Sequence, residues 1–316
     1  MSSETAQLSP LVARLRSQDV NERRVVLAEL VDDFAPVPLD VLLPLLRDAD
    51  SAVRRLTVQL LEEIGDPAAI SALIDTAADA EQDVASVAAS SLREFRTPAA
   101  VAPLVAGLGH PRIEGRLAVL VALREHNDLS TGPALAKAVG DASPDVRREA
   151  LVSLAHLRSK DFAFVLRSAL QDSSPAVRRV AVEVVAALGD IQNTPNLSRA
   201  LADEDWQVRR EAALALGKIV TPAVVTPLIY ALDDARWQVV KEAIISLGKQ
   251  HAPVAARVAS FATHEIADIR IATAFALGES GEGAAEEPLR RLLLDADTGV
   301  QKSAQRALDR LKAPRA

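Results

Sequence analysis

The sequence contains no cysteine, few aromatic residues and no long uncharged apolar run. The absence of cysteine excludes disulfides, thiolate metal sites, iron–sulfur clusters and cysteine nucleophiles. Aromatic residues make up only 3% of the chain, although 49% of it is hydrophobic, so its core must be aliphatic. No stretch reaches the roughly 18 uncharged apolar residues of a membrane span, and residues 1–10 are polar, without the apolar segment of a secretion signal. We therefore expect no membrane insertion and a cytoplasmic location.

The charge balance and the missing motifs exclude further functions. Lysine and arginine number 36 against 43 acidic residues, so the net charge is -7. This balance argues against a mainly electrostatic grip on nucleic acid or on anionic lipid. The chain also lacks a phosphate-binding Gly-x4-Gly-Lys-Ser/Thr loop and the Gly-x-Ser-x-Gly turn of a serine nucleophile. We expect neither ATP-driven chemistry nor a nucleophilic triad.

What the sequence does contain is an internal repeat. Each unit has one anchor position, usually an apolar residue, followed by a small residue four positions later and by Leu or Val eight positions later. The anchors are 31 residues apart in eight of nine intervals and 30 residues apart in the other. This spacing predicts a single repeat array over residues 1–316. The anchors are Glu22, Val53, Val84, Gly115, Val146, Val177, Val208, Val239, Ile269 and Val300.

Within each unit, the apolar residues recur with the period of a helix. They occupy the anchor and the positions four, five, eight and eleven residues later, which together form the buried face of the second helix of the unit. The position four residues after the anchor is usually Ala, which lets neighbouring helices approach closely. The seventh unit shows the pattern with Val208, Ala212, Ala213, Leu216 and Ile219.

Prolines that follow a capping residue mark the helix starts. In Ser143-Pro144 and Ser174-Pro175 the serine hydroxyl is expected to cap a second helix, and a first helix is expected, for example, from Val224 to Leu232. No segment alternates with period two, so we predict no sheet. Because one helix pair cannot bury its apolar faces alone, stacked pairs must share a core. The predicted fold is all-α, an α–α superhelix of about ten two-helix repeats.

One repeated motif resembles a known family. The pattern Asp-x4-Val-Arg-x2-Ala-x3-Leu-Gly, present in Asp203–Gly217 and echoed in Asp234–Gly248, is similar to the short HEAT-like repeat named after phycobilisome lyases. The resemblance extends over about the whole chain and implies an armadillo-like α solenoid. Members of this class act as chromophore-lyase subunits, assembly factors and adaptors, and related arrays include a metal-dependent hydroxylase and DNA glycosylases.

Charged residues recur at two positions around the anchors. An aspartate five residues before the anchor and an arginine one residue after it are present in most units. Such regular recurrence predicts a structural ladder, in which Asp caps or pairs at the turn between helices and Arg bridges layers, because catalytic carboxylates need a singular environment. The ladder residues are Asp48, Asp79, Asp141, Asp172, Asp203, Asp234, Asp295, Arg23, Arg54, Arg116, Arg147, Arg178, Arg209 and Arg270.

A second basic position lies two residues after the anchor. At 100° per residue it points about 130° away from the apolar face, toward solvent. These cations either form a positive band on the inner surface, suited to an acidic protein segment, or belong to a solvated face that Glu149, Glu211 and Glu242 offset. The residues are Arg24, Arg55, Arg148, Arg179, Arg210, Lys241 and Lys302.

The histidines do not predict a metal site. A hydroxylase of the related metal-dependent type needs several His-Glu pairs, and only His264-Glu265 has this dipeptide. No two histidines have close helical ligand spacing, so each is expected to be a lone surface residue. We predict no catalytic residue, no metal and no cofactor.

The most distinctive residues lie in the seventh to ninth units. Trp206 and Trp237, the two tryptophans, are each expected to be the first residue of a second helix. The position six residues after the anchor points about 170° from the apolar face, and yet it is apolar in three consecutive units. These residues form either a partner-binding stripe or framework contacts between layers. The candidate partner-binding residues are Trp206, Trp237, Leu214, Ile245 and Phe275, with Arg210, Lys241 and Tyr230 at the rim.

The sequence thus favours a non-enzymatic scaffold or adaptor, or an assembly factor, that binds another protein with an acidic or apolar segment on its concave face. The resemblance implies one alternative, a bilin lyase-like subunit that acts on a chromophore-carrying client protein. Without cysteine, the chain itself does not carry the chromophore as a thioether. A nucleic-acid-binding helical array is the second alternative, and the net charge opposes it.

Overall fold

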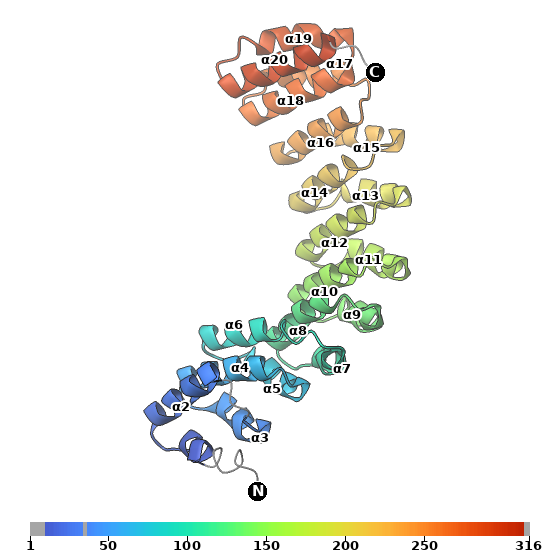
Figure 1. Cartoon of the computed structure of the whole chain (residues 1–316). Helices are drawn as coiled ribbons and strands as arrows, with labels where there is room; N and C mark the ends of the chain where they lie inside the picture. The colour runs from blue at the N-terminus through green and yellow to red at the C-terminus, as the bar shows by residue number, and fades with distance from the viewer. Residues whose placement is uncertain (1–9, 34–36, 313–316) are drawn as a thin grey trace. The chain divides into compact units, whose positions relative to one another are not determined.

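The computed structural model describes residues 10–33 and 37–312. The chain divides into two compact units, one ending at Phe162 and the other beginning at Ala163. Both units consist of stacked helix pairs, and no strand occurs in the two described ranges. Within each unit, the second helices of successive pairs form one row and the first helices form another (Figure 1). The predicted all-α repeat fold is confirmed.

The first unit stacks the second helices α2, α4, α6, α8 and α10 in chain order. The first helices α5, α7 and α9 pack beside them. Its helices are α2 (Val20–Asp33), α3 (Leu39–Leu42), α4 (Ser51–Ile64), α5 (Ile70–Thr76), α6 (Gln82–Ser91), α7 (Pro98–Gly107), α8 (Ile113–His126), α9 (Gly132–Ala138) and α10 (Pro144–His156).

The second unit stacks the second helices α12, α14, α16, α18 and α20, each packed on the first helix of its own pair. As predicted, Trp206 and Trp237 begin α14 and α16. Its helices are α11 (Ala163–Ser168), α12 (Pro175–Ala187), α13 (Thr194–Ala200), α14 (Trp206–Leu216), α15 (Val225–Tyr230), α16 (Trp237–Lys249), α17 (Ala255–Val258), α18 (Ala267–Ser280), α19 (Glu286–Leu292) and α20 (Thr298–Lys312).

The anchor positions form the core of the stack. Val53, Val146 and Val239 are each 0% exposed, as is the small residue four positions later in most repeats. Where that residue is Thr57, its hydroxyl donates back to the carbonyl oxygen of Val53 at 2.8 Å, which satisfies the buried polar group. Burial at these positions follows the predicted helical period.

The first helices differ from the prediction. The expected single helix from Val224 to Leu232 is a short α-helix, α15, preceded by the 3-10 turn Pro222–Val224 and followed by the 3-10 turn Ala231–Asp233. The serine caps were also predicted wrongly, because neither Ser143 nor Ser174 caps its helix with its hydroxyl. The amide of Ser143 instead donates to the carboxylate of Asp141 at 2.8 Å, so the recurrent aspartate satisfies this part of the turn.

In each turn between helices, the residue five positions before the anchor, here called the ladder position, accepts a hydrogen bond from the amide two residues later. At Asp203 the donor is the amide of Asp205, at 2.9 Å. The arginine after the anchor closes the same turn, since Arg209 donates to the carbonyl oxygen of Asp203 at 2.8 Å. The same amide bond is present in all ten repeats, at Ser17, Asp48, Asp79, His110, Asp141, Asp172, Asp203, Asp234, His264 and Asp295.

The same arginines connect neighbouring repeats. Arg178 donates from Nε and Nη2 to the two carboxylate oxygens of Asp203, both at 2.8 Å, and its side chain is 9% exposed. A bidentate pair of this kind fixes the spacing of two layers as well as their charge. The predicted ladder is therefore confirmed. Its inter-repeat pairs are Arg23–Asp48, Arg54–Asp79, Arg116–Asp141, Arg178–Asp203, Arg209–Asp234 and Arg270–Asp295, with N···O distances of 2.6–2.9 Å.

Histidine takes the ladder position where the preceding repeat has no arginine. The residue after the anchor is Ala85 in the third repeat and Val240 in the eighth, and the next ladder positions are His110 and His264. Each histidine accepts the turn amide through Nδ1, at 3.3 and 3.1 Å. An imidazole makes this bond without a net charge, whereas a carboxylate there needs a cation. Histidine in place of aspartate thus preserves the hydrogen bond of the turn and avoids an unpaired carboxylate.

This substitution pattern predicts that an arginine added at position 240 restores the stability lost when His264 is changed to Asp. His264→Asp alone is expected to lower the free energy of unfolding by about 1–3 kcal/mol, because position 240 offers its half-buried carboxylate a valine and no arginine. Adding Val240→Arg is expected to recover most of the loss, with a coupling energy of about 0.5–3 kcal/mol between the two changes. Urea unfolding of the wild type, both single variants and the double variant measures this coupling. Strictly additive effects would show that the two positions are independent.

Candidate functional site

The candidate residues of the seventh and eighth repeats lie on two adjacent second helices. Trp206 and Leu214 belong to α14, while Trp237 and Ile245 belong to α16, and the two helices pack directly on each other. Leu214 and Ile245 are half-buried, although they lie on the side of the helix away from the anchors. These side chains therefore contribute both to contacts between layers and to the accessible surface.

An aromatic residue and a charge pair stand together at the start of α16. Trp237 is 36% exposed, and Nζ of Lys241 lies 5.7 Å from the centroid of its ring, within cation–π range. The same Nζ donates to a carboxylate oxygen of Asp268 on α18 at 2.9 Å. Lys241 thus joins an exposed aromatic face to the neighbouring repeat.

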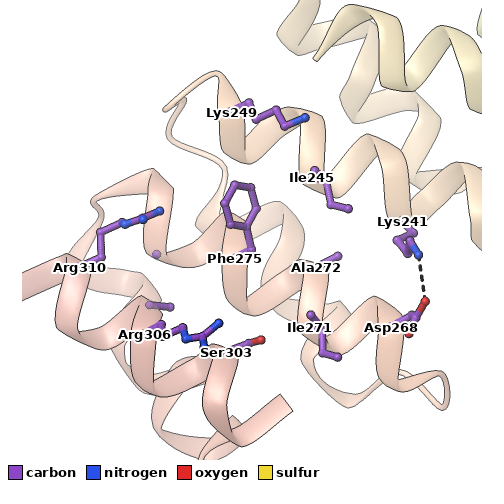
Figure 2. Close-up of a pocket in the computed structure, with 12 residues that line it drawn as sticks. Lys241, Ile245, Lys249, Asp268, Ile271, Ala272, Phe275, Ser303, Arg306 and Arg310 are labelled. Atoms are coloured by element: carbon purple, nitrogen blue, oxygen red, sulfur yellow. Dashed lines mark hydrogen bonds and ion pairs between the residues drawn. The ribbon is translucent and has the colours of Figure 1, made fainter. Parts of the chain in front are cut away.

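A pocket of about 720 Å³ opens between α16, α18 and α20. Its apolar lining includes Ile245 from α16 and both Ile271 and Phe275 from α18. Figure 2 shows Phe275 in the middle, with Ile245 beside it and charged side chains at both ends. A volume of this size is typical of sites that hold a small ligand or a few side chains.

Small residues make room for this pocket. A Cβ atom at Gly248 would lie 2.9 Å from the ring of Phe275, and one at Gly278 would lie 2.7 Å from the Cβ of Ala307. The ring of Phe275 consequently rests on the backbone of α16, and α20 approaches α18 closely at Gly278. Glycine at these two positions is needed for the close approach, and Gly278 lines the pocket together with Ala272.

The pocket is rimmed mainly by cations. Lys241, Lys249, Arg306 and Arg310 line it, against the single acidic residue Asp268. Arg310 forms an ion pair with Glu279, and Lys241 pairs with Asp268. Within the described part of the chain, Lys249 and Arg306 make no ion pair. The site therefore combines an apolar floor with positive charge in a chain whose net charge is -7.

The structure brings together only part of the predicted set. Lys241, Ile245 and Phe275 line the pocket, and Trp237 contacts it through Lys241. Tyr230 does not line it. This residue ends α15, the first helix of its pair, and is 73% exposed. The remaining candidates, Trp206, Arg210 and Leu214, lie one layer away on α14.

Several lining residues were missed, and one of them carried a sequence signal. Ile271 lies two residues after its anchor, where seven other repeats have Lys or Arg. An apolar residue at a basic position indicates an altered surface. Arg306 similarly occupies, in the last repeat, the position that Phe275 occupies in the ninth. Ala272, Gly278 and Ala307 carried no signal, because small residues are common throughout the array.

Some of the basic side chains two residues after the anchors form ion pairs or hydrogen bonds. Arg24 pairs with Asp50, and this hydrogen bond lowers the pKa of Asp50 to about 2. Arg148 pairs with Asp145 on its own helix at 3.3 Å, and Arg179 donates to the side-chain oxygen of Gln207 at 3.1 Å. Glu149, one of the acidic residues expected to offset this position, pairs instead with Arg124 at 2.7 Å.

The described residues contain no group of three or more side chains placed to hold a metal ion. The prediction of lone surface histidines is wrong in two places. Nδ1 of His251 lies 3.3 Å from a carboxylate oxygen of Glu279. His110 has a side chain that is 12% exposed, and its Nε2 lies 3.0 Å from a carboxylate oxygen of Asp75. The reason is its place in the turn ladder. Among the helices of the described ranges, none has the length and apolar character that a membrane crossing requires.

Comparison with known proteins decides the family. A family model described as HEAT repeats matches residues 8–93, 71–155, 132–204, 163–248 and 194–267, far more than half of the chain. The chain is a HEAT-repeat protein. A second model, described as PBS lyase HEAT-like repeat, matches residues 269–295. The HEAT assignment confirms the resemblance seen in the repeat motif. No curated protein matches the chain in sequence.

Solved structures share the HEAT fold at low sequence identity. An engineered protein is 22% identical, with a TM-score of 0.52, over 96% of this chain and 98% of that one. Kap95p, solved in a complex with RanGDP, is 14% identical with a TM-score of 0.63, and importin beta is 15% identical with a TM-score of 0.60. Both alignments cover 98% of this HEAT-repeat chain but 48% and 52% of the other. The chain thus spans about half the length of these two proteins.

Proposed function

We propose that this HEAT-repeat chain is a non-enzymatic protein-binding scaffold of an adaptor or assembly-factor type. Its working surface lies on the second helices α14, α16 and α18. The observation that carries the proposal is the row of apolar side chains at Leu214, Ile245 and Phe275, which lie on the side away from the anchors and end in an open apolar pocket. Accessible apolar side chains of this kind contribute hydrophobic free energy when a partner covers them.

The family context supports the proposal. Kap95p is a solenoid of related fold that was solved bound to another protein, RanGDP. The residues that match the HEAT pattern in the present chain maintain the stack, whereas the proposed surface lies outside that pattern. Its partner is accordingly expected to be set by the exposed side chains, and to present an apolar or acidic segment.

Substitution of the apolar row tests the scaffold function. We expect Leu214→Ser, Ile245→Ser and Phe275→Ser together to weaken binding of the natively co-purified partner by about tenfold or more, because they remove interface side chains. Affinity is measured by surface plasmon resonance with the partner identified by mass spectrometry. Circular dichroism first establishes that the variant remains helical.

The control for this experiment uses the same position in other repeats. Val121 and Val152 also lie six residues after their anchors and are half-buried in the first unit. Val121→Ser with Val152→Ser removes equivalent apolar groups away from α14, α16 and α18, and should leave affinity within about twofold. Unchanged binding in the triple variant, or equal losses in both variants, contradicts the proposed surface.

The match to the PBS lyase HEAT-like repeat favours a second candidate, a bilin lyase-like subunit that works on a client protein. Non-covalent bilin binding near Trp206 and Trp237 is the form this activity takes in a chain without cysteine. Titration with free bilins, followed by visible absorption, tests it. A spectral shift lost in Trp237→Ala supports the lyase-like function, and no shift at all argues against it.

A further inference from the structure

The pocket between α16, α18 and α20 has a more specific chemistry than the rest of the proposed surface. Its middle is apolar, with Ile245, Ile271 and Phe275 around a volume of about 720 Å³. Half-buried aliphatic and aromatic groups around an open hollow gain energy when an apolar side chain displaces water from them. The occupant therefore has an apolar group of side-chain size.

The two ends of the pocket carry positive charge. Figure 2 places Lys249 from α16 above Phe275 and Arg306 from α20 below it, whereas Lys241 lies beside Asp268. Lys249 and Arg306 have no ionic partner in the described part of the chain, so their charge is available to a ligand. Asp268 is the one acidic lining residue, and Lys241 already binds it at 2.9 Å. The occupant is consequently anionic beside its apolar group.

The distribution of these charges favours a peptide. Cations come from two helices that flank α18, with the apolar lining between them. A ligand that satisfies both ends needs separate anionic groups on either side of an apolar centre. A chain segment in which Asp or Glu residues bracket a large apolar side chain has this arrangement, whereas a single-headed amphiphile places its charge at one end only.

We infer that this pocket binds a segment of a partner protein in which an apolar side chain lies between acidic residues. The inference rests on the proposed scaffold function. The apolar side chain packs against Phe275 and Ile245, and the flanking carboxylates accept hydrogen bonds from Lys249 and Arg306. Charge-assisted bonds of this kind fix the orientation of the segment, while the apolar contact supplies most of its affinity.

A selection from randomised peptides of about twelve residues, displayed on phage and panned against the full chain, tests this inference. We expect the enriched peptides to share Asp or Glu on both sides of Leu, Ile, Phe or Trp. In fluorescence anisotropy with the best enriched peptide, Lys249→Glu with Arg306→Glu should weaken binding by about tenfold or more. Phe275→Ser should have a comparable effect, and Phe275→Leu a smaller one.

A matched charge reversal serves as the control. Arg290→Glu with Arg291→Glu makes the same change of charge on α19, where both side chains are exposed and outside the pocket. This variant should bind the peptide within about twofold of the wild type. Enrichment of neutral or basic peptides, binding that is insensitive to the pocket variants, or no enrichment overturns the inference. Dodecanoate binding without any selected peptide overturns it as well, in favour of a single-headed amphiphile.

The native partner separates this inference from the scaffold function. If the change of Leu214, Ile245 and Phe275 to Ser weakens the native complex but Lys249→Glu with Arg306→Glu does not, the acidic-segment inference fails and the scaffold function stands. If neither variant weakens that complex, the proposed binding surface itself is wrong. Loss of binding in both variants supports both.

Discussion

Replacing Arg178 with methionine is expected to lower the free energy of unfolding by about 3–5 kcal/mol, the range for breaking a buried ion pair. Arg178 is 7% exposed and donates to both carboxylate oxygens of Asp203 and to the carbonyl oxygen of Asp172. Methionine keeps the aliphatic stem but leaves the Asp203 carboxylate without its cation. Urea unfolding followed by far-ultraviolet circular dichroism measures the loss.

The position of the carboxylate explains the size of this effect. Burial by itself raises the pKa of Asp203, but the hydrogen bonds from Arg178 and from the amide of Asp205 outweigh it, and the pKa is lowered overall. The arginine is thus the main group that favours the charged form of Asp203 against burial. Arg290→Met, which removes an exposed pair with Glu286, should cost less than about 1 kcal/mol. Equal losses for the two variants contradict a structural role for the ladder.

The stack could be predicted from the sequence because its period is set by local geometry. Apolar residues four, five and eight positions after Val208 lie on one face of any α-helix, and their recurrence every 31 residues admits few other folds. The start of α14 at Trp206 was predicted correctly. The periodicity did not predict that the first helices divide into 3-10 and α segments. This division depends on packing against the following second helix.

The two histidines of the ladder show a different limit. Taken one residue at a time, His110 and His264 have no ligand spacing and resemble ordinary surface histidines. Only the comparison of each with the residue after the preceding anchor, Ala85 or Val240, shows that histidine appears where arginine is missing. The information was in the sequence, but it links two positions about 25 residues apart in neighbouring repeats, as the arginine pairs do.

The candidate site was predictable in its large residues and not in its small ones. Ile245 and Phe275 were identified because apolar side chains opposite the core are unusual, and the structure places both at the pocket. The hollow itself depends on how closely α20 approaches α18 at Gly278 and Ala307. That distance is a property of two helices in contact, and no periodicity within either helix specifies it.

Acid is expected to destabilise the stack strongly, because its ladder is built on carboxylates. The pKa of Asp295 is lowered by the hydrogen bond from Arg270, and those of Asp79 and Asp234 are lowered by their arginines despite burial, which raises them. A carboxyl group whose pKa falls on folding stabilises the native state above its unfolded pKa of about 3.9, and this contribution is lost as the pH drops through the folded value. We expect the urea midpoint to fall by about half or more between about pH 4 and about pH 2.

The pKa of Glu211 is shifted in the opposite direction, which adds a second test of the acid prediction. Burial, followed by the nearby charge of Glu183, raises the pKa of Glu211. The charged form is disfavoured in the native state, so this group costs stability at neutral pH, and the cost is relieved as the pH falls toward its folded pKa. As the pH is lowered from about 7 to about 4.5, the urea midpoint of the wild type should therefore stay level or rise slightly. It should fall only below that pH, where the ladder carboxylates become protonated. Glu211→Gln should raise the neutral midpoint and leave the later fall in place, whereas a midpoint that declines steadily from neutral pH would contradict both assignments.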